Sequence, residues 1–309
     1  MAGSEIAQSP CVVFAYQEMG YECLRMLFEL GAPIKALFTH EDNPEEEIWW
    51  HSCADLARAR STPVFTDDKV NQGLVNRIAT IKPAIIYSFY YRHLLSDSIL
   101  NLAPRGAFNL HGSLLPAYRG RAPVNWVLVN GESKTGVTLH HMVAQADAGD
   151  IVAQREIPID DSDTALSLYR KMVPAGADLI RRMHPLIAAG SAPRSPQNLA
   201  QGSYFGRRRP EDGRIDWNWP ARRVFNLVRG VTHPYPGAFC FADGRKLLVW
   251  SAAISAEYGN QAAPGTVIRR TRDSIEVACG AGAVRLLKVE FERKAEGAAG
   301  DILDGIGRL

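Results

Sequence analysis

Short apolar runs that alternate with helical patterns most constrain the fold of the first half of this chain. Several runs have the length and composition of buried strands, at residues 11–16, 34–39, 63–65, 84–89, 107–111 and 136–142. Helical patterns lie between them, over residues 20–31, 70–80 and 122–130. Because strands joined through helices form βαβ units, the pattern predicts an α/β, Rossmann-like domain with a mostly parallel sheet.

A different pattern follows a long amphipathic helix that opens near Asp163. Residues 190–197 are rich in Pro, Ser and Gly, which is typical of a linker between domains. Short β-rich runs come next, at residues 238–241, 246–250, 266–268 and 275–278. We therefore expect two domains, a Rossmann-like domain over residues 1–200 and a small β domain over residues 201–309.

Composition excludes several classes of protein. The 35 basic and 33 acidic side chains leave a formal charge of +2, so bulk charge gives no reason to expect a nucleic-acid or membrane partner. No apolar run reaches the ~18 residues of a membrane span, and the first residues lack the pattern of a secretory signal. The five cysteines show no C-x-x-C spacing, which favours reduced thiols in a cytoplasmic protein.

The common cofactor and metal motifs are missing. Gln17-Glu18-Met19-Gly20 offers one glycine where a dinucleotide fingerprint needs three, and there is no P-loop. His140 and His141 are adjacent on a predicted strand, so their rings would point to opposite faces and could not bind one metal ion. Ser113 near His111 raises the possibility of a hydrolase, but the G-x-S-x-G elbow is absent.

Asn109 and His111 are the clearest candidates for chemistry. Two residues apart on a strand, they project to the same face near its end, where open α/β sheets place their ligands. An amide can donate to a developing oxyanion, and an imidazole can take a proton from a nucleophile when a carboxylate orients it. From the residues alone, a polar pair at a strand end is more often a satisfied loop cap than a catalytic pair, and both interpretations stay open.

Longer motifs around this pair carry a family resemblance. The sequence from Asn109 onward resembles the 10-formyltetrahydrofolate-dependent formyltransferases in Asn109-x-His111, Ser113-Leu114-Leu115-Pro116, Arg119-Gly120 and Asp147-Ala148-Gly149-Asp150-Ile151. Further segments are similar to the members that formylate UDP-4-amino-4-deoxy-L-arabinose in lipid A modification and polymyxin resistance. They are residues 89–94, 118–123, 125–132, 135–140, 205–208 and 236–239.

The resemblance implies both a fold and a site. It implies a Rossmann-like catalytic domain followed by an OB-like β-barrel, with Asn109, His111 and Asp147 as the catalytic trio. The implied contacts of the donor, 10-formyltetrahydrofolate, are His93, Leu94, Leu95, Arg121, Val143, Ala144, Gln145, Ala146 and Asp147. No metal is implied. A turn residue at Asp147 and an ordinary surface arginine at Arg121 are the alternatives.

The resemblance also implies small-molecule substrates, a folate donor and a UDP-amino sugar, with no membrane or nucleic-acid partner. Because the chain ends at Leu309, we expect a free-standing formyltransferase without the dehydrogenase half of the bifunctional relative. We expect Arg207 or Arg208 to bind the acceptor's phosphates, since guanidinium groups suit bidentate phosphate contacts. The alternatives are a methionyl-tRNA formyltransferase and a non-catalytic folate-binding module.

Overall fold

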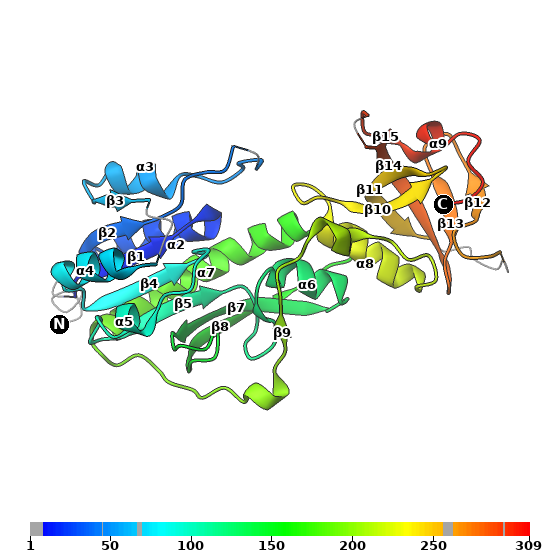
Figure 1. The fold of residues 1–309 in the computed structure, drawn as a ribbon. Helices are drawn as coiled ribbons and strands as arrows, with labels where there is room; N and C mark the ends of the chain where they lie inside the picture. Colours follow the sequence, from blue (N-terminus) through cyan, green and yellow to red (C-terminus); the bar gives the residue numbers. More distant parts are fainter. Residues whose placement is uncertain (1–8, 45, 67–69, 256–261, 293) are drawn as a thin grey trace. The chain divides into compact units, whose positions relative to one another are not determined.

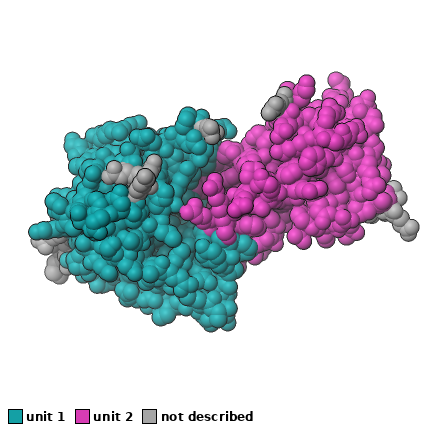
Figure 2. All heavy atoms as spheres, viewed as in Figure 1, with its two compact units in different colours: residues 1–120, 135–158, 170–205 teal, residues 121–134, 159–169, 206–309 magenta. Residues whose placement is uncertain are grey.

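The computed structural model describes residues 9–44, 46–66, 70–255, 262–292 and 294–309. The chain forms two compact units, shown in Figure 2. The first comprises residues 1–120, 135–158 and 170–205, and the second comprises residues 121–134, 159–169 and 206–309. The second unit thus takes two earlier segments as well as the C-terminal part, and the division at residue 200 stays a prediction.

A seven-stranded sheet in the order β3-β2-β1-β4-β5-β7-β8 forms the centre of the first unit (Figure 1). The pairs β1–β2, β1–β4, β2–β3 and β4–β5 are parallel, whereas β5 and β7 are antiparallel. The predicted mostly parallel α/β sheet is therefore confirmed. The strands are β1 (Cys11–Ala15), β2 (Ile34–Phe38), β3 (Val64–Phe65), β4 (Ile85–Phe89), β5 (Ala107–His111), β7 (Lys134–His141) and β8 (Ile151–Pro158).

Helices cover this sheet. Its central strands are buried on both faces and are therefore composed mostly of apolar residues. All five residues of β1 are fully buried, as expected for a central parallel strand. The helices are α2 (Gln17–Glu29), α3 (Cys53–Arg58), α4 (Gln72–Ile81), α5 (Asp97–Leu100) and α7 (Ala165–Ala188). Gly176 lets α7 pack closely, because a β carbon there would lie 2.5 Å from the Met19 sulfur and 2.8 Å from Leu110.

Local signals account for where these helices begin and end. Asn71 caps α4 by accepting a hydrogen bond from the Leu74 N–H at 3.1 Å. Ser52 caps α3 in the same way through Asp55. Gly31 follows α2 at a φ of +74°, a left-handed conformation that suits glycine at a helix end.

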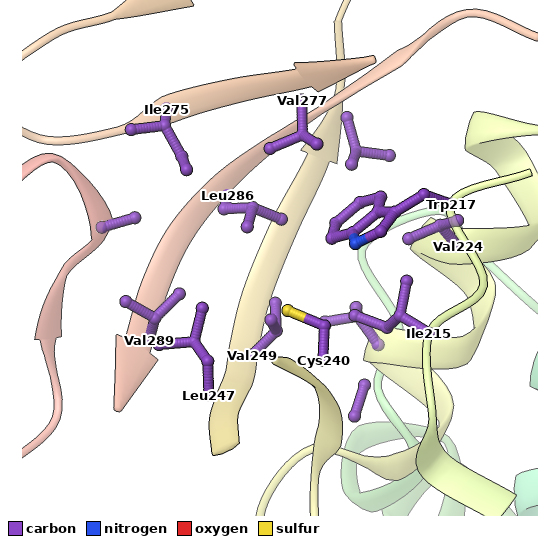
Figure 3. Packing of buried hydrophobic residues seen from close by; sticks show 14 of the residues in the cluster. Ile215, Trp217, Val224, Cys240, Leu247, Val249, Ile275, Val277, Leu286 and Val289 are labelled. Atoms are coloured by element: carbon purple, nitrogen blue, oxygen red, sulfur yellow. The ribbon is translucent and has the colours of Figure 1, made fainter. Parts of the chain in front are cut away.

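The second unit contains an antiparallel sheet in the order β10-β11-β14-β13-β12, with β15 beside β14. Its strands are β10 (Ala238–Ala242), β11 (Arg245–Ile254), β12 (Val267–Arg270), β13 (Ile275–Ala278), β14 (Ala283–Phe291) and β15 (Gly297–Ala298), and its helices are α6 (Pro123–Val129), α8 (Ala221–Val231) and α9 (Ala299–Ile302). Figure 3 shows the core between this sheet and α8, where Trp217, Val224 and Leu286 are buried. The predicted small β domain is confirmed.

Two short strands, β6 (Arg119–Gly120) and β9 (Tyr204–Phe205), form a separate parallel pair in the first unit. This pair matters because β6 follows directly on the motif that contains His111. Two 3-10 turns, Leu199–Gln201 and Pro210–Gly213, flank β9. Across the described ranges, no helix has the length and apolar character needed to cross a membrane.

Candidate active site

The β5–β7 pair brings the site's side chains together. Asn109 and His111 lie in the last three residues of β5, and Asn109 pairs with His140 on the antiparallel strand β7. The loop that carries Asp147 joins β7 to β8. His111 and His140 are buried, at 6% and 1% exposure. The candidate trio of Asn109, His111 and Asp147 is therefore assembled within the first unit, together with a second histidine.

The Asp147 carboxylate lies at the centre of this group. Its Oδ1 atom is 3.4 Å from Asn109 Nδ2, 3.6 Å from His111 Nδ1 and 3.5 Å from His140 Nε2. Its Oδ2 atom accepts a hydrogen bond from the Gly120 N–H at 2.9 Å. One carboxylate therefore connects the amide, both imidazoles and the backbone of β6.

The loop around Asp147 is held in a specific backbone conformation. Asp147 has a φ of +55°, in the left-handed region that aspartate tolerates better than most residues. Gln197 Nε2 donates to the carbonyl oxygens of Asp147 and Gly149, at 2.9 and 2.6 Å. A β carbon at Gly149 would lie 1.9 Å from the His141 carbonyl oxygen, so only glycine fits there. Asp147 is thus a turn residue whose carboxylate lies within the candidate site.

Backbone carbonyls fix the tautomers of both histidines. His111 Nε2 lies 2.8 Å from the Tyr118 carbonyl oxygen, which can only accept, so Nε2 carries the proton. In the neutral ring, His111 Nδ1 is then a base, and it faces Asp147. His140 Nδ1 donates to the His141 carbonyl at 2.8 Å, so His140 Nε2 accepts from the Asn109 amide at 3.1 Å. Asn109 therefore presents its N–H₂ side to the site.

The electrostatics keep Asp147 ionised. Burial raises the pKa of its carboxyl, but the neighbouring imidazoles of His111 and His140 and the Gly120 N–H outweigh burial and lower it. The net result is a pKa well below the usual range of an aspartate. The site thus holds a fixed negative charge beside the free nitrogen of His111.

His140 is the site residue that sequence reasoning missed. The prediction that His140 and His141 point apart is correct, because His141 Nε2 binds the Pro193 carbonyl at 3.1 Å. What the sequence could not show is the β5–β7 register that places His140 beside Asn109. In the part of the chain that the structure describes, no cluster of side chains suitable for a metal ion is found.

Ser113 does not provide a hydrolase nucleophile. It is fully buried, and its hydroxyl donates to the Ala117 carbonyl at 2.6 Å. A hydroxyl committed to a carbonyl and closed off from solvent cannot attack a substrate without rearrangement. The hydrolase alternative therefore lacks its nucleophile.

Two large apolar side chains in the segments predicted to bind the donor are exposed to solvent. Leu94 is 70% exposed and Val143 is 45% exposed, which is unusual for large aliphatic residues. The exposed His93 ring packs edge-on against His40, with ring centres 5.1 Å apart, while Leu95 packs against the core. Residues Ala144, Gln145 and Ala146 lie in the loop between Val143 and Asp147.

The predicted arginines belong to the second unit, whereas the trio belongs to the first. Arg208 lies over the Trp126 ring at 4.4 Å and donates to the Asp212 carbonyl at 2.8 Å. Burial lowers its pKa, an effect that Asp212 partly offsets. Arg207 is exposed, and no side-chain partner for it is found among the described residues. Arg121 is also exposed and has partners of its own.

Comparison with known families identifies the class of protein. Two protein families match the chain. "Formyl transferase" matches residues 33–183, and "Formyl transferase, C-terminal domain" matches residues 208–307. The chain therefore belongs to the formyl transferase family and is a formyltransferase. The family resemblance seen in the sequence is confirmed.

Solved structures share the fold at low identity. An N-formyltransferase from Helicobacter canadensis, solved with folinic acid and dTDP-3-aminofucose, is 18% identical with a TM-score of 0.73, covering 90% of this chain and 98% of that one. WlaRD, a sugar 3N-formyl transferase solved with dTDP and 5-N-formyl-THF, is 17% identical with a TM-score of 0.68, covering 93% and 99%. HypX from Aquifex aeolicus is 18% identical with a TM-score of 0.64, covering 97% of this chain and 49% of that one. The chain spans about half the length of HypX.

Proposed function

We propose that this formyltransferase moves a formyl group from 10-formyltetrahydrofolate to the amine of a sugar nucleotide in the cytoplasm, and that the acceptor is UDP-4-amino-4-deoxy-L-arabinose. The observation that carries the proposal is the Asp147 carboxylate, 3.6 Å from His111 Nδ1 and 3.4 Å from the Asn109 amide. Two proteins of similar fold were solved with folate derivatives and with dTDP or a dTDP-amino sugar, which supports these substrate classes. The choice of uridine and arabinose rests on the sequence likeness.

His111 acts as the base in this proposal. The acceptor amine attacks the formyl carbon in its neutral form, and His111 Nδ1 takes the proton that the amine loses as the C–N bond forms. Tyr118 holds the ring through Nε2, so the only nitrogen free to accept is the one beside Asp147. The Asp147 charge stabilises the resulting imidazolium. His111 then returns the proton to the folate nitrogen as the bond from that nitrogen to the formyl carbon breaks.

Asn109 stabilises the negative charge that develops on the formyl oxygen. Its amide nitrogen has two N–H groups, of which one is used by His140 at 3.1 Å. The other makes only a long contact of 3.4 Å with Asp147 and can turn to an incoming oxygen. Such a pre-positioned donor is the usual device for an oxyanion in acyl transfer.

The donor is assigned to the exposed apolar segments. Leu94 and Val143 offer apolar surface to a flat ring system, and the loop from Val143 to Asp147 leads directly into the trio. A folate ring bound there would cover surface that is costly to leave in water. Arg121 is kept as a proposed donor contact from the sequence likeness.

Product analysis tests the proposal. The purified chain is incubated with 10-formyltetrahydrofolate and, separately, UDP-4-amino-4-deoxy-L-arabinose, dTDP-3-aminofucose and methionyl-tRNA, and products are identified by mass spectrometry. We expect the uridine sugar to gain one CO group with the highest kcat/KM. Formylation of methionyl-tRNA at an equal or higher rate would overturn the proposal. Folate binding without turnover of any amine would favour the non-catalytic module, which the assembled trio disfavours.

A further inference from the structure

Arg119 is a buried cation without a counter-charge. The residue is 8% exposed, and its Nε atom is enclosed without a hydrogen-bond partner. Within the described ranges, no hydrogen bond or ion pair of its guanidinium group is found. A guanidinium cannot lose its proton in a protein, so its charge has to be compensated in another way. Burying a charge without such compensation is costly.

Another buried arginine in the same chain shows what compensation looks like. Arg229 is 7% exposed, and its guanidinium donates to Asn226 Oδ1 at 2.9 Å and to the Asp160 carbonyl at 2.8 Å. Arg229 is thus a structural arginine with its own acceptors. Arg119 has the same burial without those acceptors, so an anion is a chemically suitable partner for it.

The backbone places Arg119 next to the candidate trio. The residue before it, Tyr118, accepts the hydrogen bond from His111 Nε2 at 2.8 Å. The residue after it, Gly120, donates to Asp147 Oδ2 at 2.9 Å. Strand β6 is fixed on its other side, because the Arg119 N–H binds the Ser203 carbonyl at 3.0 Å. The residues on either side of Arg119 are therefore both hydrogen-bonded to the candidate trio, Tyr118 to His111 and Gly120 to Asp147.

We propose that Arg119 binds a phosphate of the acceptor's diphosphate. This inference rests on the proposed sugar-nucleotide acceptor and names a residue that recognises it. A guanidinium group binds phosphate oxygens through parallel, charge-assisted hydrogen bonds. The phosphate would supply both the missing counter-charge and the missing acceptor for Nε.

The donor also carries anions, on its glutamate carboxylates, so the source of the anion has to be decided. In a sugar nucleotide, a single sugar ring separates the reacting amine from the nearest phosphate. In the folate, a benzoyl ring and an amide separate the reacting nitrogen from the nearest carboxylate. Because Arg119 is one residue from two groups that contact the trio, the anion nearer to the reacting atoms is favoured.

Titration calorimetry with defined probes tests this assignment. UDP and dTDP report the diphosphate, and folinic acid reports the donor. The variants are Arg119→Met, which removes the charge, and Arg119→Lys, which keeps the charge but loses the bidentate geometry. Arg58→Met is the control for bulk charge, because the Arg58 side chain is 62% exposed and paired with Asp55.

We expect Arg119→Met to weaken UDP and dTDP binding about 10- to 100-fold, the loss of one or two hydrogen bonds to a charged group. Folinic acid should bind within about twofold of the wild type, a change too small to represent a lost contact. The melting temperature without ligand should stay or rise, because an uncompensated charge is removed, whereas Arg229→Met should lower it. Should Arg119→Met fail to fold, a severalfold weakening of UDP binding by Arg119→Lys supports the same assignment.

Three results would overturn the assignment, and each points to a different error in it. Unchanged UDP affinity in Arg119→Met would leave the sugar-nucleotide acceptor intact and remove Arg119 from its binding. Loss of folinic acid binding alone would transfer Arg119 to the donor's carboxylates. Absence of UDP and dTDP binding by the wild type would mean that the proposed acceptor class itself is wrong.

Discussion

Replacement of Gly149 by alanine is expected to inactivate the enzyme without touching a reacting group. A β carbon at this position would lie 1.9 Å from the His141 carbonyl oxygen and 2.9 Å from its carbon. Ordinary contact begins at 3.4 Å, so the loop has to move by 3.4 − 1.9 = 1.5 Å, or the carbonyl has to yield by the same amount. Neither side is the end of a flexible side chain.

The displacement propagates directly to Asp147, two residues earlier. Gln197 Nε2 holds both residues through their carbonyls, at 2.9 and 2.6 Å. The His141 N–H to Asp150 carbonyl bond of 2.8 Å closes the same loop. A shift of 1.5 Å exceeds the tolerance of these bonds and of the Gly120 N–H to Asp147 Oδ2 bond. Since a misplacement of about 1 Å can cost about 10²-fold in rate, we expect kcat to fall by about 10²-fold or more.

Steady-state kinetics and urea unfolding check this prediction together. Gly149→Ala should also lose about 1–3 kcal/mol of unfolding free energy, the usual cost of overpacking. Gly307→Ala is the matched control, because a β carbon there meets nothing within 4 Å. Wild-type kcat in a folded Gly149→Ala protein would refute the view that this loop positions Asp147.

Further predictions concern four other residues. Asn109→Ala should lower kcat about 10²- to 10³-fold, and His111→Ala about 10²- to 10⁴-fold, as measured on purified variants of unchanged melting temperature; near-normal turnover in either would remove that residue from the mechanism. Burial lowers the pKa of His184, whose Nδ1 contacts the Tyr87 hydroxyl at 2.8 Å, to about 4. In the unfolded chain His184 is protonated below about pH 6.5, but in the folded chain only below about pH 4. The free energy of unfolding should therefore fall by about 3 kcal/mol as the pH drops through that window. Urea unfolding of His184→Asn should show a flatter pH dependence, and an equally steep one would mean that other groups cause it. Arg207→Glu should raise the acceptor KM without changing the folinic acid affinity; an unchanged KM would leave Arg207 as a solvated surface residue.

Much of the fold could be predicted because its strands are buried on both faces. Strand β5 and strand β13 have the predicted bounds, residues 107–111 and 275–278, because turn residues bracket both of these mostly buried runs. Strand β8 was not predicted because it lies at the edge of the sheet and exposes Gln154, Arg155 and Glu156 in its middle. An exposed edge strand lacks the apolar pattern on which the prediction depended.

Helix α8 and strand β14 were also missed, although their signals were present. In α8, Val224, Leu227, Val228 and Val231 have helical spacing and are buried, at 0%, 2%, 1% and 6% exposure. Arginines flank these positions and interrupt the apolar run. The apolar stripe can be recognised as a buried helix face only once the sheet against which α8 packs is known.

The residues of the candidate site could be predicted from the sequence. The contacts between them could not, because these contacts join residues far apart along the chain. Spacing on a strand was enough to place Asn109 and His111 on one face. The place of Asp147 came from the family resemblance, because a contact 38 residues along the chain leaves no local signal. The neighbourhood of His140 depends on the register of two strands, and Arg208's stacking on Trp126 depends on tertiary structure.

The pH dependence of Asp147→Asn tests the central claim most directly, that an ionised Asp147 supports His111 as the base. The wild-type kcat/KM should rise with pH through one ionisation of the free enzyme. In Asp147→Asn the imidazolium loses its negative neighbour, so the rising limb should move to lower pH while the maximal rate falls. A profile that keeps its position in Asp147→Asn, with only a uniform loss of rate, would show that Asp147 merely shapes the loop and would contradict the account.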